Sequence, residues 1–142
     1  MSQSSVSAAL VEAYHATSYR VFLDDRPFDL RVGQYSDALG SLYQATRTCT
    51  AVFVTAENPF SLTFSTVENC ASQRLLAQQL SALTEHIFEG AGQGHDEVWP
   101  PEASFLALGI SREQACALGQ QFGQNAIIWA DADSVPELIL LR

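Results

Sequence analysis

The chain contains no lysine, and its seven basic residues are all arginines. Sixteen acidic residues bring the net charge to −9, and the arginines are scattered from Arg20 to Arg142. A nucleic-acid-binding protein gathers basic residues on one face to neutralise phosphates, so this composition excludes a nucleic-acid partner and disfavours an anionic membrane. The absence of lysine also excludes a Schiff-base lysine, a P-loop lysine and a lysine general base.

Cysteine and long apolar runs are equally scarce. The three cysteines, Cys49, Cys70 and Cys116, form no C-x-x-C pair. Such a count predicts a reducing compartment and thiols that act as small buried side chains. No stretch reaches the ~18 apolar residues of a membrane-spanning helix, and the first residues lack the basic and apolar segments of a signal peptide. We therefore expect a soluble cytoplasmic protein with no membrane partner.

Charged residues are sparse as well, at 16% against a usual ~25%, whereas hydrophobic residues make up 47%. Abundant apolar residues argue against disorder. The shortage of charge fits an apolar surface that a second subunit covers, as in a homo-oligomer, or a surface rich in Gln, Ser and Thr. At 142 residues, we expect a single domain spanning residues 1–142, with residues 1–5 as a disordered tail.

Hydrophobic periodicity predicts four helices and seven strands. Helices are predicted over 6–14, 37–45, 66–84 and 112–122, and strands over 19–23, 28–32, 50–56, 86–89, 104–109, 125–130 and 137–141. The run 50–56 is apolar without alternation, which is typical of a central strand buried on both faces. Strands that follow one another without a helix indicate an α+β fold, with a mixed or mainly antiparallel sheet and helices packed against it. The longest helix carries a predicted apolar stripe of Val67, Cys70, Ala71, Leu75, Leu76, Leu80 and Leu83.

Most of the polar residues that suggest a site lie where the chain crosses from the central strand to the longest helix. Pro59 forces Asn58 out of helical geometry, and Ser65 with Glu68 fits a capping box. These local roles leave Asn69 unexplained, because asparagine is unfavourable inside a helix. Polar side chains at the end of a central strand commonly bind ligands. The acidic side chains of this crossing would repel an anion, so we expect a neutral or cationic ligand, or a peptide.

Other cofactor and catalytic patterns fail on spacing. In the segment GAGQGHDEVWPPE a G-x-G-x-x-G fingerprint lacks its third glycine, because His95 occupies that position. No nucleophile elbow of the G-x-S-x-G type is present. We therefore predict no cofactor and no metal. A metal site lacks any recognised ligand spacing among its candidates, which are His86, Glu89, His95, Asp96 and Glu102.

Three segments carry a family resemblance: VTAENPFS followed by VEN, W-x-x-E-x-SFLALGI, and FGQNAIIW. In order and spacing they resemble the bacterial family catalogued as domain of unknown function 3293, over Tyr14 to Trp129. The resemblance implies a small bacterial single-domain protein without an assigned activity. An aromatic residue is usual in that family where this chain has Glu57, which makes Glu57 a poor candidate for a shared catalytic role. The residues that match the family pattern are Asn58, Pro59, Glu68, Asn69, Glu102, Gly123, Gln124 and Trp129.

The strand-end pattern and the family resemblance select the same five polar residues, all at or beside the predicted ends of elements: Asn58, Glu68, Asn69, Glu102 and Gln124. The first hypothesis is a polar-floored pocket that binds a small molecule or a peptide segment. The second is a hydrolase-like enzyme with Glu68 and Glu102 as acid and base, since burial beside an apolar strand would raise the pKa of Glu102. The third is a structural or oligomerisation module whose polar groups satisfy buried backbone.

Overall fold

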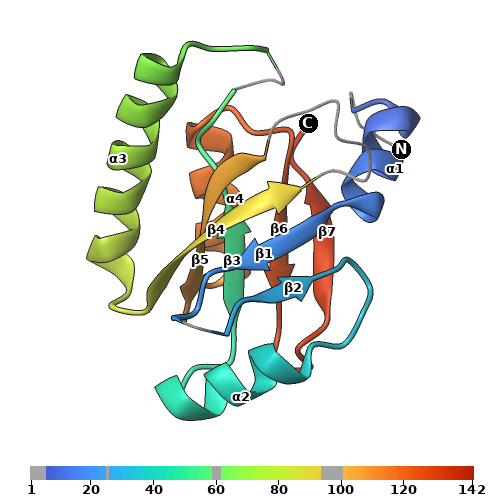
Figure 1. Cartoon of the computed structure of the whole chain (residues 1–142), viewed down its shortest axis with the longest axis vertical. Helices are drawn as coiled ribbons and strands as arrows, with labels where there is room; N and C mark the ends of the chain where they lie inside the picture. Colours follow the sequence, from blue (N-terminus) through green and yellow to red (C-terminus); the bar gives the residue numbers. More distant parts are fainter. Residues whose placement is uncertain (1–5, 25, 59–61, 94–100) are drawn as a thin grey trace.

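The described part of the chain contains four helices and seven strands, which follow one another in the predicted order. The computed structural model describes residues 6–24, 26–58, 62–93 and 101–142, so the predicted tail at 1–5 lies outside the described residues. The elements are α1 (Ala8–Ala16), β1 (Ser18–Val21), β2 (Phe28–Leu30), α2 (Asp37–Thr46), β3 (Ala51–Val54), α3 (Thr66–Leu83), β4 (Ile87–Gln93), β5 (Glu102–Leu108), α4 (Arg112–Gln121), β6 (Ala126–Ala130) and β7 (Pro136–Leu140). They form one compact domain, and the α+β prediction is confirmed (Figure 1).

All seven strands belong to one sheet, in the order β2-β1-β4-β5-β3-β6-β7. Every neighbouring pair is antiparallel. Three pairs join strands that are consecutive in the sequence, namely β1 with β2, β4 with β5, and β6 with β7. Strand β3 lies between β5 and β6, and all four of its residues are buried, as predicted for a central strand.

The sheet curls strongly, so that β1 and β4 cross in front of β3 and β6 (Figure 1). Tyr19 of β1 and Phe53 of β3 pack edge to face, with ring centroids 5.3 Å apart, although two strands separate β1 from β3 in the sheet. Gly90 of β4 makes this contact fit, because a Cβ there would lie 2.8 Å from the Phe53 ring and 2.5 Å from the Arg20 carbonyl oxygen. The missing side chain lets Phe53 pass beneath β4.

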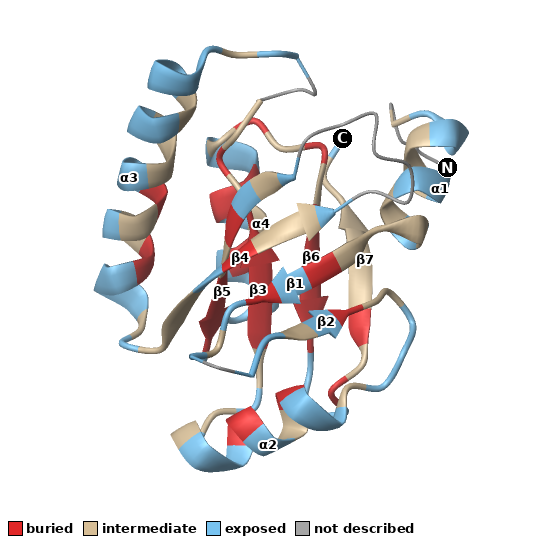
Figure 2. Ribbon diagram, in the orientation of Figure 1, coloured by how far each residue is buried: buried red, intermediate tan, exposed pale blue. Residues whose placement is uncertain are grey.

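The curled sheet has two hydrophobic clusters, one on each face. On the inner face, β1, β2 and α2 pack against the central strands, and the cluster includes Leu30, Leu39 and Leu106. On the outer face, α3 and α4 pack against the sheet, and the cluster includes Val52 of β3 and Leu76 of α3. Figure 2 shows the buried residues concentrated along the central strands. No helix among the described residues has the length and hydropathy needed to span a membrane.

The predicted apolar stripe of helix α3 is mostly not buried. Leu76 and Leu80 are buried, whereas Val67 is 79% exposed, Leu75 54% and Leu83 43%. The helix stands at one side of the domain (Figure 1). Of its residues, only Leu76 and Leu80 belong to a buried cluster, so most of the stripe has no sheet to pack against. The prediction of buried thiols was also wrong. Cys49 and Cys70 are exposed and Cys116 is half-buried, all as free cysteines.

Several predicted boundaries shift by one to four residues, two of them for a clear local reason. The first helix begins two residues later than expected, because Ser7 is its N-cap and accepts a hydrogen bond from the Leu10 N–H. None of the residues of α1 is fully buried. Strand β4 continues to Gln93 instead of ending at Glu89, since Gly90 and Gly92 still pair with β5 and β1.

Candidate functional site

A cavity of about 340 Å³ lies between the inner face of the curled sheet and α1. Ligand pockets typically have volumes of ~300–1,000 Å³. Its walls are mainly apolar and include Leu10, Tyr14, Tyr19, Phe53, Ile128 and Leu138. Polar side chains gather at the end where β3 finishes and β5 begins, and these include Asn58, Glu102, Ser104, Gln124 and Asn125. The cavity therefore combines an apolar body with one polar end.

Asn58 links the end of β3 to the start of β5. Its backbone is left-handed, with φ +47°, a conformation that asparagine tolerates better than most residues. The side-chain amide donates to Glu102 Oε2 over 3.1 Å. The amide oxygen accepts from the Phe64 N–H at 2.9 Å and from Asn69 Nδ2 at 3.1 Å. Asn58 thus positions the Glu102 carboxylate and fixes the path of the crossing.

Asn69 has a structural explanation that its helical position alone did not provide. Its Oδ1 accepts from the Asn58 N–H at 3.0 Å, and its Nδ2 donates to Asn58 Oδ1 and to the Phe64 carbonyl. The two asparagines therefore clamp the crossing onto the first turns of α3. Asn69 is not among the residues that line the cavity. It acts on the site through Asn58, which it holds by hydrogen bonds.

Glu102 is half-buried at the polar end of the cavity. Burial raises the pKa of its carboxyl, the hydrogen bond from Asn58 opposes that shift, and the charge of Glu57 adds to it. Glu57 accepts a hydrogen bond from the Ala103 N–H at 3.2 Å. Its pKa is also raised by burial, and this hydrogen bond opposes the shift. The carboxylate whose charge acts on Glu102 is therefore Glu57.

Two further residues of this region were missed in the sequence. The carbonyl of Ala103 accepts from Thr55 Oγ1 at 2.7 Å and from Gln73 Nε2 at 2.9 Å. Gln73 also accepts from the Ala56 N–H at 2.7 Å. Gln73 follows Asn69 by four residues, so both amides point from one helical face. That spacing was a signal that could have identified Gln73.

Gln124 and Glu68 have different places. Gln124 Nε2 donates to the Glu57 carbonyl at 3.0 Å, which joins Gln124 to the cluster around Asn58 and Glu102. Glu68 is exposed and accepts from the Ser65 N–H, which confirms the predicted capping box. It does not line the cavity. The structure thus brings four of the five predicted site residues into one region and places Glu68 at the start of α3.

Loss of the cap of α3 is expected to cost stability without changing the cavity. Ser65→Ala should lower the free energy of unfolding by about 1 kcal/mol, because it removes the acceptor for the Glu68 N–H. Glu68→Gln should change it by less than about 0.5 kcal/mol, since glutamine can also complete a capping box. Urea unfolding measures both. A larger loss for Glu68→Gln than for Ser65→Ala would contradict the capping role.

Glu102→Gln is expected to flatten the pH dependence of stability. The raised pKa of Glu102 means that the folded state binds its proton more tightly than the unfolded state does. This group's stabilising contribution is therefore fully present below the ordinary carboxyl pKa and is lost as the pH rises through the raised value. In urea unfolding at increasing pH above 4.5, wild type should lose more stability than Glu102→Gln. A steeper loss in the variant would contradict the assignment.

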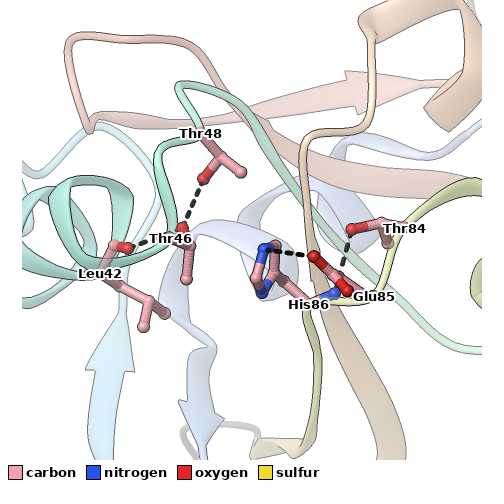
Figure 3. A network of polar contacts seen from close by, with 6 residues as sticks. All are labelled: Leu42, Thr46, Thr48, Thr84, Glu85 and His86. Carbon is pink, nitrogen blue, oxygen red and sulfur yellow. Dashed lines mark hydrogen bonds and ion pairs between the residues drawn. The ribbon is translucent and has the colours of Figure 1, made fainter.

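His86, the histidine candidate for a metal that the structure describes, does not meet Glu102. His86 immediately precedes β4, whereas Glu102 pairs with Gly92 near the other end of that strand. Figure 3 shows His86 beside Glu85, 3.7 Å away, and near Thr84. No group of three or more His, Cys, Asp or Glu side chains in the described part of the chain could hold a metal. His95 and Asp96 lie outside the described residues.

Comparison with known families gives one match. A family model described as "Protein of unknown function (DUF3293)" matches residues 54–127, just over half of the chain. The matched segment contains Asn58, Glu68, Asn69, Glu102 and Gln124. Searches of curated proteins and of solved structures found no match. The chain therefore belongs to the DUF3293 family of proteins of unknown function.

Proposed function

We propose that the protein binds a small molecule or a peptide segment in the cavity between the curled sheet and α1. The observation that carries this proposal is the pairing of an apolar chamber with the half-buried carboxylate of Glu102 at one end. Ligand sites commonly combine apolar walls with a few fixed polar groups that set orientation.

The polar end is held in place before any ligand arrives. The Asn58 side chain donates a hydrogen bond to Glu102. The Asn69 side chain in turn accepts from the Asn58 N–H and donates to Asn58 Oδ1. Gln124 is fixed by the Glu57 carbonyl. Side chains that are restrained in this way lose little conformational freedom on binding, which favours affinity.

A hydrolase-like enzyme is a second candidate. Two carboxyl groups in this region, Glu57 and Glu102, have a raised pKa, and the charge of Glu57 contributes to the shift of Glu102. Acid–base catalysis uses carboxyl groups whose pKa is shifted toward the working pH. In this version Glu57 takes the place that the sequence assigned to Glu68, whose carboxylate caps α3. Loss of turnover in Glu102→Gln with binding retained would distinguish this enzyme from a binding protein.

We also infer a bacterial, cytoplasmic protein. The family resemblance supports the bacterial source. The exposed free thiols of Cys49 and Cys70 support a reducing compartment, where such thiols persist.

A thermal-shift screen against metabolites and short peptides tests the proposal. A ligand at a hundred times its dissociation constant should stabilise the protein by about 2.7 kcal/mol. Glu102→Gln should reduce the shift given by a bound compound. The matched control Glu89→Gln should not, because Glu89 is exposed on β4 and does not line the cavity. No shift from any compound would favour the structural or oligomerisation module instead.

A further inference from the structure

We propose that the ligand carries a protonated amine on an apolar body, and that the amine binds the Glu102 carboxylate at the polar end of the cavity. This inference rests on the proposed function and names the chemical class of the ligand. It follows from three properties of the cavity, namely its charge, the direction of its hydrogen bonds and the character of its walls.

Among the described residues that line it, the cavity presents one carboxylate and no cation to match it. Glu102 carries the only carboxyl group among the described residues that line the cavity, and none of those residues is Arg, Lys or His. Arg142 donates to the lining residue Asn125 but does not itself line the cavity. None of the ion pairs found in the described part of the chain includes Glu102. A half-buried carboxylate without a cation is costly, and a ligand ammonium would supply the missing partner.

Three hydrogen-bond donors at the polar end already have acceptors within the protein. Asn58 Nδ2 donates to Glu102, Gln124 Nε2 donates to the Glu57 carbonyl, and the Ser104 hydroxyl donates to the Glu102 carbonyl at 3.0 Å. Gln124 Nε2 faces carbonyl oxygens, which can only accept hydrogen bonds, so the amide nitrogen must be the atom on that side. The amide oxygen of Gln124 is on the other side and can accept a hydrogen bond from a ligand.

The acceptors that this end offers to a ligand include the Glu102 carboxylate, the Ser104 oxygen and the Gln124 amide oxygen. An ammonium group carries three donors and no acceptor, which matches this set. A carboxylate or phosphate would bring only acceptors, and like charge beside Glu102.

The walls suit an apolar body and also favour a cation. A volume of about 340 Å³ corresponds to roughly eleven water molecules at ~30 Å³ each, enough for a short alkyl chain or a single ring. Tyr14, Tyr19 and Phe53 contribute aromatic surfaces to the lining. Aromatic faces attract organic cations as well as alkyl groups.

The test compares three compounds with the same carbon chain: hexylammonium, hexan-1-ol and hexanoate. Each is titrated at neutral pH into ¹⁵N-labelled wild type, Glu102→Gln and Glu89→Gln, and dissociation constants are taken from amide chemical shifts. Hexylammonium should bind wild type at least about ten-fold more tightly than hexan-1-ol. Glu102→Gln should remove most of that preference and leave the alcohol unchanged, whereas Glu89→Gln should keep it.

Equal or tighter binding of hexan-1-ol or hexanoate to wild type would overturn the amine assignment while leaving a ligand-binding cavity intact. A preference for hexylammonium that survives in Glu102→Gln would also overturn it, because the carboxylate would not be the recognition group. If none of the three compounds gives a saturable shift, the amine inference fails. If the metabolite and peptide screen also gives none, the proposed function fails with it.

Discussion

Leu76→Ala is expected to lower the free energy of unfolding by about 2–5 kcal/mol, the range for truncating a fully buried leucine. Leu76 is a residue of α3 that is 0% exposed and packs in the outer cluster. Its neighbour Leu75 is 54% exposed and provides a matched control, since Leu75→Ala removes the same atoms from the preceding position of the helix. That control should change stability by less than about 0.5 kcal/mol.

Urea unfolding of both leucine variants, followed by circular dichroism, measures the contrast. Equal losses would mean that Leu75 is also buried in solution, as the predicted apolar stripe required, either through another packing of α3 or through a second subunit. The comparison therefore also tests whether Leu75, part of the predicted stripe, is exposed on α3.

Gly90→Ala is expected to destabilise the protein by about 3 kcal/mol, near the upper end for overpacking a core. The new Cβ would lie 2.5 Å from the Arg20 carbonyl oxygen and 2.8 Å from the Phe53 ring. The carbonyl belongs to the neighbouring strand and cannot move without disturbing the pairing of β1 with β4. The curl that brings Tyr19 onto Phe53 should loosen with it.

Gly92→Ala is the control for this substitution, because it makes the same change two residues further along β4. The nearest atom to its new Cβ would be 3.8 Å away, an ordinary contact. We expect a neutral effect or a gain of a few tenths of a kcal/mol from the restricted unfolded chain. Thermal unfolding of both variants measures the difference, and equal melting temperatures would contradict the close approach at Gly90.

Local chemistry was predictable from the sequence. The capping boxes Ser65–Glu68 and Ser111–Gln114 are both present, and Gly123 has the left-handed φ of +67° that a helix C-terminus needs. These features depend on residues three or four apart, so no knowledge of the fold is required. The apolar face of α3 was not predictable in this way, because a stripe does not tell how much sheet lies beneath it.

The site was predictable in its positions and less so in its contacts. Asn58 and Glu102 were found because polar residues at strand ends indicate a site, and their hydrogen bond joins them. The contact between Glu57 and Ala103 depends on β3 lying next to β5, and hydrophobic patterns do not give strand order. The family resemblance argued against Glu57 in a shared catalytic role, and whether Glu57 acts on a substrate stays a prediction.

The most direct test of the central claim is a calorimetric titration of the best ligand from the thermal-shift screen into a protein whose cavity has been filled. Ala13 of α1 is exposed and lines the cavity, whereas Ala9 is exposed on the same helix and does not. Ala13→Trp should therefore weaken binding by at least about ten-fold, and Ala9→Trp should bind as wild type does. Equal affinity in both variants would contradict a binding site between the curled sheet and α1.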